Sequence, residues 1–100
     1  MTVRRAHELK CLTSYFDAIL DGRKTFEVRL NDRDFRVGDE LWLRDWNGVA
    51  YSGRSVRKLV TFIIDADAEL LPPSVTGVAD GHVVMALGPV LYPSLGVPHA

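Results

Sequence analysis

The stretch from Gly22 to Arg33 concentrates side chains that can bind a ligand or take part in catalysis. Lys24, Glu27 and Arg29 place an ammonium, a carboxylate and a guanidinium within six residues. Lysine and arginine hold phosphate groups, arginine through a planar two-point contact. A carboxylate accepts hydrogen bonds from the amino group of a base such as cytosine. This pattern favours a nucleotide site, although a solvated strand face crossed by ion pairs has the same composition.

Further polar and aromatic residues extend this candidate site. Tyr51, together with Trp42 and Trp46, offers rings on which an unpaired base can stack. A second basic cluster at Arg54, Arg57 and Lys58 is able to contact phosphate together with Arg4, Arg5 and Lys10, although such clusters are usually only solvated. The residues predicted to bind nucleic acid or another ligand are His7, Lys10, Lys24, Glu27, Arg29, Asn31, Arg33, Tyr51 and Arg54.

The same residues allow an enzyme as the alternative. Lys24 would act as a general base and Glu27 as an acid or base, which makes these two the predicted catalytic residues of a small hydrolase. A ribonuclease is a variant of this alternative, in which Lys24 or Arg29 stabilises the charge that develops on the phosphate. No Ser-His-Asp order and no metal-ligand spacing is evident, and the histidines at positions 7, 82 and 99 are scattered. We therefore expect neither a metal site nor a cofactor.

Size and composition indicate one ordinary globular domain. The chain has 100 residues and a formal net charge of −1, so a nucleic-acid site must be a local patch. We expect a single domain over residues 1–90 and a C-terminal tail over 91–100. Cys11 is the only cysteine, which excludes an internal disulfide and fits a cytoplasmic location. The first ten residues lack the apolar region of a signal peptide, and no apolar run is long enough to span a bilayer, so we expect no membrane partner.

Periodicity and turn residues predict five strands and one helix. The Asn47-Gly48 pair is a strong hairpin signal, and Gly22 fits the residue that follows a helix. The helix is expected to begin at an N-cap, Thr13 or Ser14. Residues 65–80 are predicted to form a loop. The predicted strands cover residues 3–12, 24–30, 40–46, 51–64 and 82–87, with the helix after the first strand.

These elements must position the charged stretch. In the strand over 24–30, alternation places Phe26, Val28 and Leu30 on the face expected to enter the core, and Glu27 and Arg29 on the other face. Short connections between most strands favour a small, strongly bent sheet or barrel, mainly β, with the helix at one end.

Several segments of the chain also resemble a known family. They are similar to the ASCH family of the PUA-like superfamily, and more narrowly to small phage and bacterial ASCH-like proteins of unassigned function. The segments that carry the resemblance are His7 to Lys10, Tyr15 to Arg29, Asn31 to Phe35, Val37 to Asp39, Tyr51 to Arg54 and Gly81 to Val84.

The resemblance implies a PUA-like β-barrel of five to six strands, with one main helix after the first strand beside a cleft. It also implies recognition of RNA, a nucleotide or a modified nucleoside, with the lysine, glutamate and arginine of the family's motif at Lys24, Glu27 and Arg29. One ASCH branch hydrolyses N4-acetylcytidine. Its lysine matches Lys24, but its threonine nucleophile aligns with Glu27. A third alternative is a phage-type protein that binds a host protein or dimerises, using the apolar tail from Leu91 to Val97.

Overall fold

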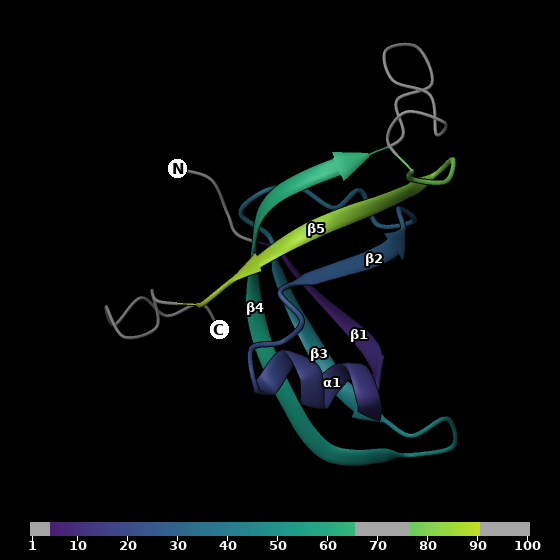
Figure 1. The fold of residues 1–100 in the computed structure, drawn as a ribbon, viewed down its shortest axis with the longest axis vertical. Coiled ribbons are helices and arrows are strands. Elements are labelled where there is room, and N and C mark those ends of the chain that lie inside the picture. The colour runs from purple at the N-terminus through teal and green to yellow at the C-terminus, as the bar shows by residue number, and fades with distance from the viewer. Residues whose placement is uncertain (1–4, 66–76, 91–100) are drawn as a thin grey trace.

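The computed structural model describes residues 5–65 and 77–90, which form one curled five-stranded sheet with a single helix (Figure 1). All six predicted elements are present within a few residues of their expected bounds. The predicted tail and most of the predicted 65–80 loop lie outside the described residues, as does Arg4. The elements are β1 (Ala6–Leu12), α1 (Thr13–Leu20), β2 (Phe26–Leu30), β3 (Glu40–Trp46), β4 (Tyr51–Asp65) and β5 (His82–Gly88).

The strand order is β1-β3-β4-β5-β2, so β1 and β2 form the two edges of the sheet. The β1–β3 pair is parallel and every other pair is antiparallel. The long strand β4 joins the two halves, because it pairs with β3 up to Leu59 and with β5 from Leu59 onward. Its register shifts after Val60, and such irregularities increase bending. The sheet therefore curls into a half-barrel, mostly β, as predicted (Figure 1).

Turn chemistry explains where the elements end. Gly22 follows the last turn of α1 with a φ of 84°, which favours glycine. In the hairpin between β3 and β4, the Asn47 side-chain oxygen accepts hydrogen bonds from the backbone N–H groups of Val49 and Ala50. The predicted N-cap of the helix is wrong: the cap position is Leu12, without a side-chain hydrogen bond. The Thr13 hydroxyl donates to a carboxylate of β3 instead.

The core fills the concave side of the sheet. Inward residues of β1, β3 and β5 meet the apolar face of α1, which packs against β1 and β3. Burying this apolar set is the main stabilising contribution for so small a domain. The buried core consists of Leu9, Cys11, Phe16, Ile19, Phe35, Leu41, Leu43, Val60, Val83 and Met85.

The predicted orientation of β2 is wrong. Phe26, Val28 and Leu30 are 45%, 51% and 54% exposed, whereas Glu27 is only 5% exposed. The alternation of apolar and polar residues correctly separates the two faces of β2. The face that turns inward, however, is the polar one. As an edge strand of a curled sheet, β2 turns Glu27 and Arg29 toward the inside, where both find ionic partners.

Candidate functional site

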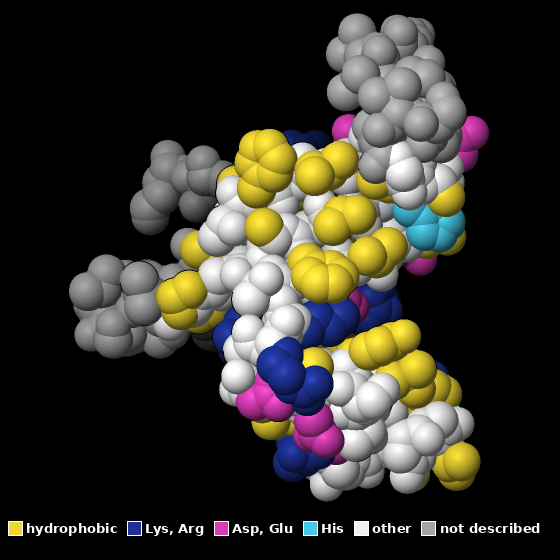
Figure 2. All heavy atoms as spheres, in the orientation of Figure 1, with side chains coloured by type: hydrophobic (Ala, Val, Ile, Leu, Met, Phe, Trp, Pro, Cys, Tyr) yellow, Lys and Arg dark blue, Asp and Glu magenta, His cyan; other side chains and the backbone are white. Residues whose placement is uncertain are grey.

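A cleft of about 630 Å³ lies between β2, α1 and the end of β1. Its size falls within the range of small-molecule sites. In Figure 2, Lys and Arg side chains gather in the hollow between β2 and α1. The lining residues are Lys10, Cys11, Leu12, Tyr15, Ala18, Arg23, Lys24, Phe26, Glu27, Val28 and Arg29.

Among the described residues, Glu27 is the only carboxylate that lines the cleft. Its side chain is nearly buried, and each oxygen has a cationic partner: Lys24 Nζ lies 2.8 Å from Oε1, and Arg29 Nε lies 2.6 Å from Oε2. A buried carboxylate needs such partners, because burial without them is costly. A carboxylate has about four acceptor positions, so Glu27 keeps capacity for a donor on a ligand.

Lys24 is held at the centre of the site. Its Nζ also donates to the Phe26 carbonyl at 2.7 Å, and it lies 5.0 Å from the centre of the Phe26 ring and 5.4 Å from that of Tyr15. Aromatic faces attract ammonium groups at this separation. Nζ is therefore fixed between a carboxylate, a carbonyl and two aromatic rings.

Arg29 connects the cleft to the opposite edge of the sheet. Besides its bond to Glu27, its Nη2 donates to the Lys10 carbonyl of β1 at 2.5 Å. Arg33, just beyond β2, donates in the same way to the Glu8 carbonyl at 2.8 Å. We call these two contacts the arginine seam. They bridge β1 and β2, the two edge strands, with side chains.

The lining of the cleft is strongly cationic. Lys10, Arg23, Lys24 and Arg29 oppose one carboxylate among the lining residues, and Arg23 also pairs with Asp21 outside the lining, so the lining keeps an excess of positive charge. Burial, helped by the negative charge of Glu27, raises the pKa of the Cys11 thiol to about 11. Cys11 is therefore protonated at neutral pH and unsuited to act as a nucleophile.

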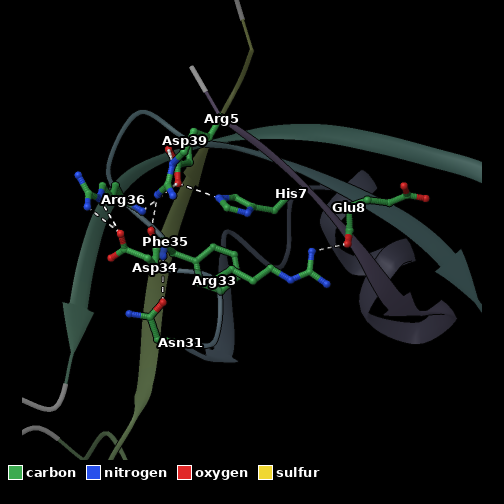
Figure 3. A network of polar contacts seen from close by, with 9 residues as sticks. All are labelled: Arg5, His7, Glu8, Asn31, Arg33, Asp34, Phe35, Arg36 and Asp39. Carbon is green, nitrogen blue, oxygen red and sulfur yellow. Dashed lines mark hydrogen bonds and ion pairs between the residues drawn. The ribbon is translucent and has the colours of Figure 1, made fainter. Parts of the chain in front are cut away.

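Three of the predicted ligand-binding residues belong to a different network (Figure 3). His7 Nε2 lies 2.8 Å from Asp39 Oδ2, and the His7 ring meets the edge of Phe35. The Asn31 side-chain oxygen accepts a hydrogen bond from the Phe35 backbone N–H at 2.9 Å. Arg33 belongs to the arginine seam. These residues hold the 31–39 connection against β1 and do not line the cleft.

Asp39 is the centre of this network. Besides His7, its carboxylate accepts hydrogen bonds from the Arg5 side chain at 2.8 Å and from the Arg36 backbone N–H at 3.0 Å. The preceding Gly38 has a φ of 96°, which allows the tight turn. The Val-Gly-Asp motif thus has a structural role here.

Two further predicted residues also lie away from the cleft lining. The guanidinium of Arg44 lies over the Tyr51 ring, with Cζ 3.9 Å from the ring centre. Arg54 pairs with Asp17 of α1 at 3.1 Å and with Asp45 of β3 at 2.9 Å, so it fastens the helix to the sheet. Of the nine predicted residues, the structure brings together Lys10, Lys24, Glu27 and Arg29.

Sequence reasoning did not assign Tyr15, Arg23 or Phe26 to the site, yet all three line the cleft. Alternation predicts that Phe26 enters the core, and nothing in the local pattern sets Tyr15 apart as a ligand contact. Arg23 lies next to Lys24 and pairs with Asp21 at 2.9 Å. Its position within the charged stretch was the one local signal available.

Metal sites and membrane-spanning helices are the two other features to consider in the described residues. No group of three or more His, Cys, Asp or Glu side chains in residues 5–65 and 77–90 is placed to hold a metal ion. Over the same residues, no helix is long and apolar enough to cross a membrane.

Comparison with known proteins identifies relatives of unassigned function. The family described as a domain of unknown function (DUF3850) matches residues 6–87, which include the helix and all of the described strands except the last residue of β5. An uncharacterized 12.9 kDa protein in the GpA 3′ region of Escherichia phage P2 is 38% identical over 61 residues. That alignment covers 61% of this chain and 56% of the phage protein, so the chain spans little more than half the length of this relative.

Proposed function

The chain belongs to the DUF3850 family, and we propose that it binds a nucleotide, either free or as an unpaired unit of an RNA, in the cleft between β2 and α1. The observation that carries this proposal is the lining, which holds four cations and one nearly buried carboxylate. An anionic ligand neutralises the excess positive charge, and a planar base with an amino group supplies the donor that Glu27 can still accept.

Each part of a nucleotide has a partner in this arrangement. Lys10 and Arg23 line the cleft and suit phosphate, which lysine binds as a point charge and arginine through a planar fork. Tyr15 and Phe26 offer aromatic surface for a base or sugar. Lys24 and Arg29 hold the Glu27 carboxylate in one orientation, which prepares it to accept from a base.

We also infer that the half-barrel is an ASCH-type, PUA-like fold. The helix directly after the first strand and the motif residues gathered at a cleft beside that helix support this assignment. The assignment to the ASCH-type fold and the proposed ligand are independent of each other, because the ligand proposal depends only on the residues that line the cleft.

The test is equilibrium binding of cytidine monophosphate and of a short single-stranded RNA to the full chain. We expect Lys24→Ala to weaken binding by about tenfold or more, because a charge-assisted contact and the orientation of Glu27 are both lost. Arg36→Ala is the matched control, since Arg36 is an exposed cation paired with Asp34 away from the cleft. Affinity should also fall with increasing salt. Equal binding by both variants, or none by the unmodified protein, would contradict the proposal.

The same preparation separates binding from hydrolysis. We expect N4-acetylcytidine to be bound without turnover, because Lys24 is held as a donor and the Cys11 thiol is protonated at neutral pH. Release of acetate that disappears in Lys24→Ala would replace the binding module with a hydrolase at the same site.

A further inference from the structure

The outer side of β2, β5 and the end of β4 carries a continuous apolar surface. Figure 2 shows hydrophobic side chains gathered over these strands. The strand register aligns them in rows: Phe26 beside Ala86 and Phe62, then Val28 beside Val84 and Ile64. We call this surface the outer apolar face. Its members are Phe26, Val28, Leu30, Phe62, Ile64, Val84 and Ala86.

This face contradicts the usual arrangement of a sheet with one solvated side, where the outward residues are polar. In β2 the polar residues are turned inward and the apolar ones outward, so alternation leads us to expect burial that residues 5–65 and 77–90 do not provide. Phe62, at 62% exposed, shows the same mismatch on β4. A large exposed apolar surface marks an interaction site.

The composition of the face indicates what covers it. The outward positions of β2 and β5, and those of β4 beside them, hold no Asp, Glu, Lys or Arg, and their one histidine, His82, lies beside Leu30 at the end of the face. Two identical faces can therefore meet without burying an unpaired charge, which a contact between the same patch on two subunits requires. A partner of opposite charge would find no complementary group among these positions.

The size of the outer apolar face also fits a second copy of the same face. The five most exposed members present on the order of 450 Å² of surface, given their fractional exposures and typical side-chain areas. Two copies would then bury on the order of 900 Å² from these five residues alone, which is close to the roughly 1,000 Å² at which specific interfaces begin. Two twisted sheets pack face to face about 10 Å apart in this way.

We propose that the outer apolar face is the interface of a two-fold symmetric dimer of this chain, with β2, β5 and β4 of one copy packed on the same strands of the other. This inference does not depend on the ligand of the cleft. Phe26 and Val28 belong to both surfaces, so the interface borders the cleft in each subunit.

Analytical ultracentrifugation of the full chain over a concentration series tests the proposal. We expect a monomer–dimer equilibrium whose dissociation constant rises about thirtyfold or more in Phe62→Lys, and likewise in Leu30→Lys on the other edge of the face. Val49→Lys is the matched control, because Val49 is 88% exposed in the β3–β4 hairpin, outside the face. Circular dichroism and urea unfolding check that each variant is folded.

Three results would overturn the dimer. The unmodified chain could remain monomeric up to about 200 μM, weaker than specific complexes usually are. A dimer could form with the same dissociation constant in Phe62→Lys and Leu30→Lys. Val49→Lys could weaken the dimer as much as Phe62→Lys does, which would make the effect one of charge alone.

Discussion

Glu27 combines near-complete burial with two cationic neighbours, and this makes its replacement costly. Its carboxylate balances Lys24 and Arg29, which would otherwise meet as two like charges beside the core. Removing one member of a buried ion pair leaves its partner uncompensated and is strongly destabilising. The same carboxylate is the proposed acceptor for a base, so stability and binding depend on one side chain.

We therefore predict that Glu27→Gln lowers the free energy of unfolding by about 2–4 kcal/mol, because Lys24 and Arg29 lose their counter-charge. Urea unfolding at pH 7 measures the change. Glu8→Gln is the control: Glu8 pairs with Arg44 at an exposed position, where an ion pair contributes roughly 0–1 kcal/mol. Equal losses of unfolding free energy in Glu27→Gln and Glu8→Gln would show that the burial of Glu27 does not determine the destabilisation.

At the scale of elements, Asp45 fastens three segments together. It lies on β3 and accepts hydrogen bonds from Thr13 at the start of α1 at 2.6 Å and from Arg54 of β4 at 2.9 Å. The helix has only eight residues, too few to be stable alone in water, so such contacts hold it in place beside the cleft.

The hydrogen bonds of Asp45 should make the stability of the fold depend on pH. Hydrogen bonds from Thr13 and Ser52, with help from Arg54, lower the pKa of Asp45 below its ordinary value. A carboxyl whose pKa is lower in the folded state stabilises the fold above its unfolded pKa, and that contribution is lost as the pH falls below about 4. We predict that Asp45→Asn is less stable than the unmodified chain at pH 7 and that the difference narrows toward pH 3, in thermal unfolding followed at both pH values. A stability difference between the two proteins that stays the same from pH 7 to pH 3 would contradict the role of the ionised Asp45 carboxylate.

At the scale of the whole molecule, the curl of the sheet brings its two edges together without joining their backbones. The arginine seam spans the gap, with side-chain donors from Arg29 and Arg33 reaching carbonyls of β1. Unpaired strand edges are liable to pair with other chains, and covering them is one way in which proteins prevent this. The seam also bridges the two edges of the half-barrel beside the cleft.

We predict that Arg33→Met destabilises the fold by about 1 kcal/mol, the net contribution of a single hydrogen bond, and speeds hydrogen exchange in β1 more than in β5. Exchange followed by mass spectrometry on peptides from each strand gives the comparison. Arg36→Ala serves again as the control, because its side chain pairs only with exposed Asp34 among the contacts that the structure describes. Uniform acceleration over all strands would indicate global loss of stability instead of a local opening.

The amino-acid sequence by itself determined the elements and the charged motif. Asn47-Gly48, Gly22 and the alternation in β2 act through neighbours in the chain, so they are visible without a structure. The tertiary structure alone decided that Phe26 faces outward and that His7 belongs to the Asp39 network. Both outcomes depend on which strands become edges and how far the sheet curls. Those features arise from pairing between residues distant in sequence, and the residues concerned carry no local sign of it.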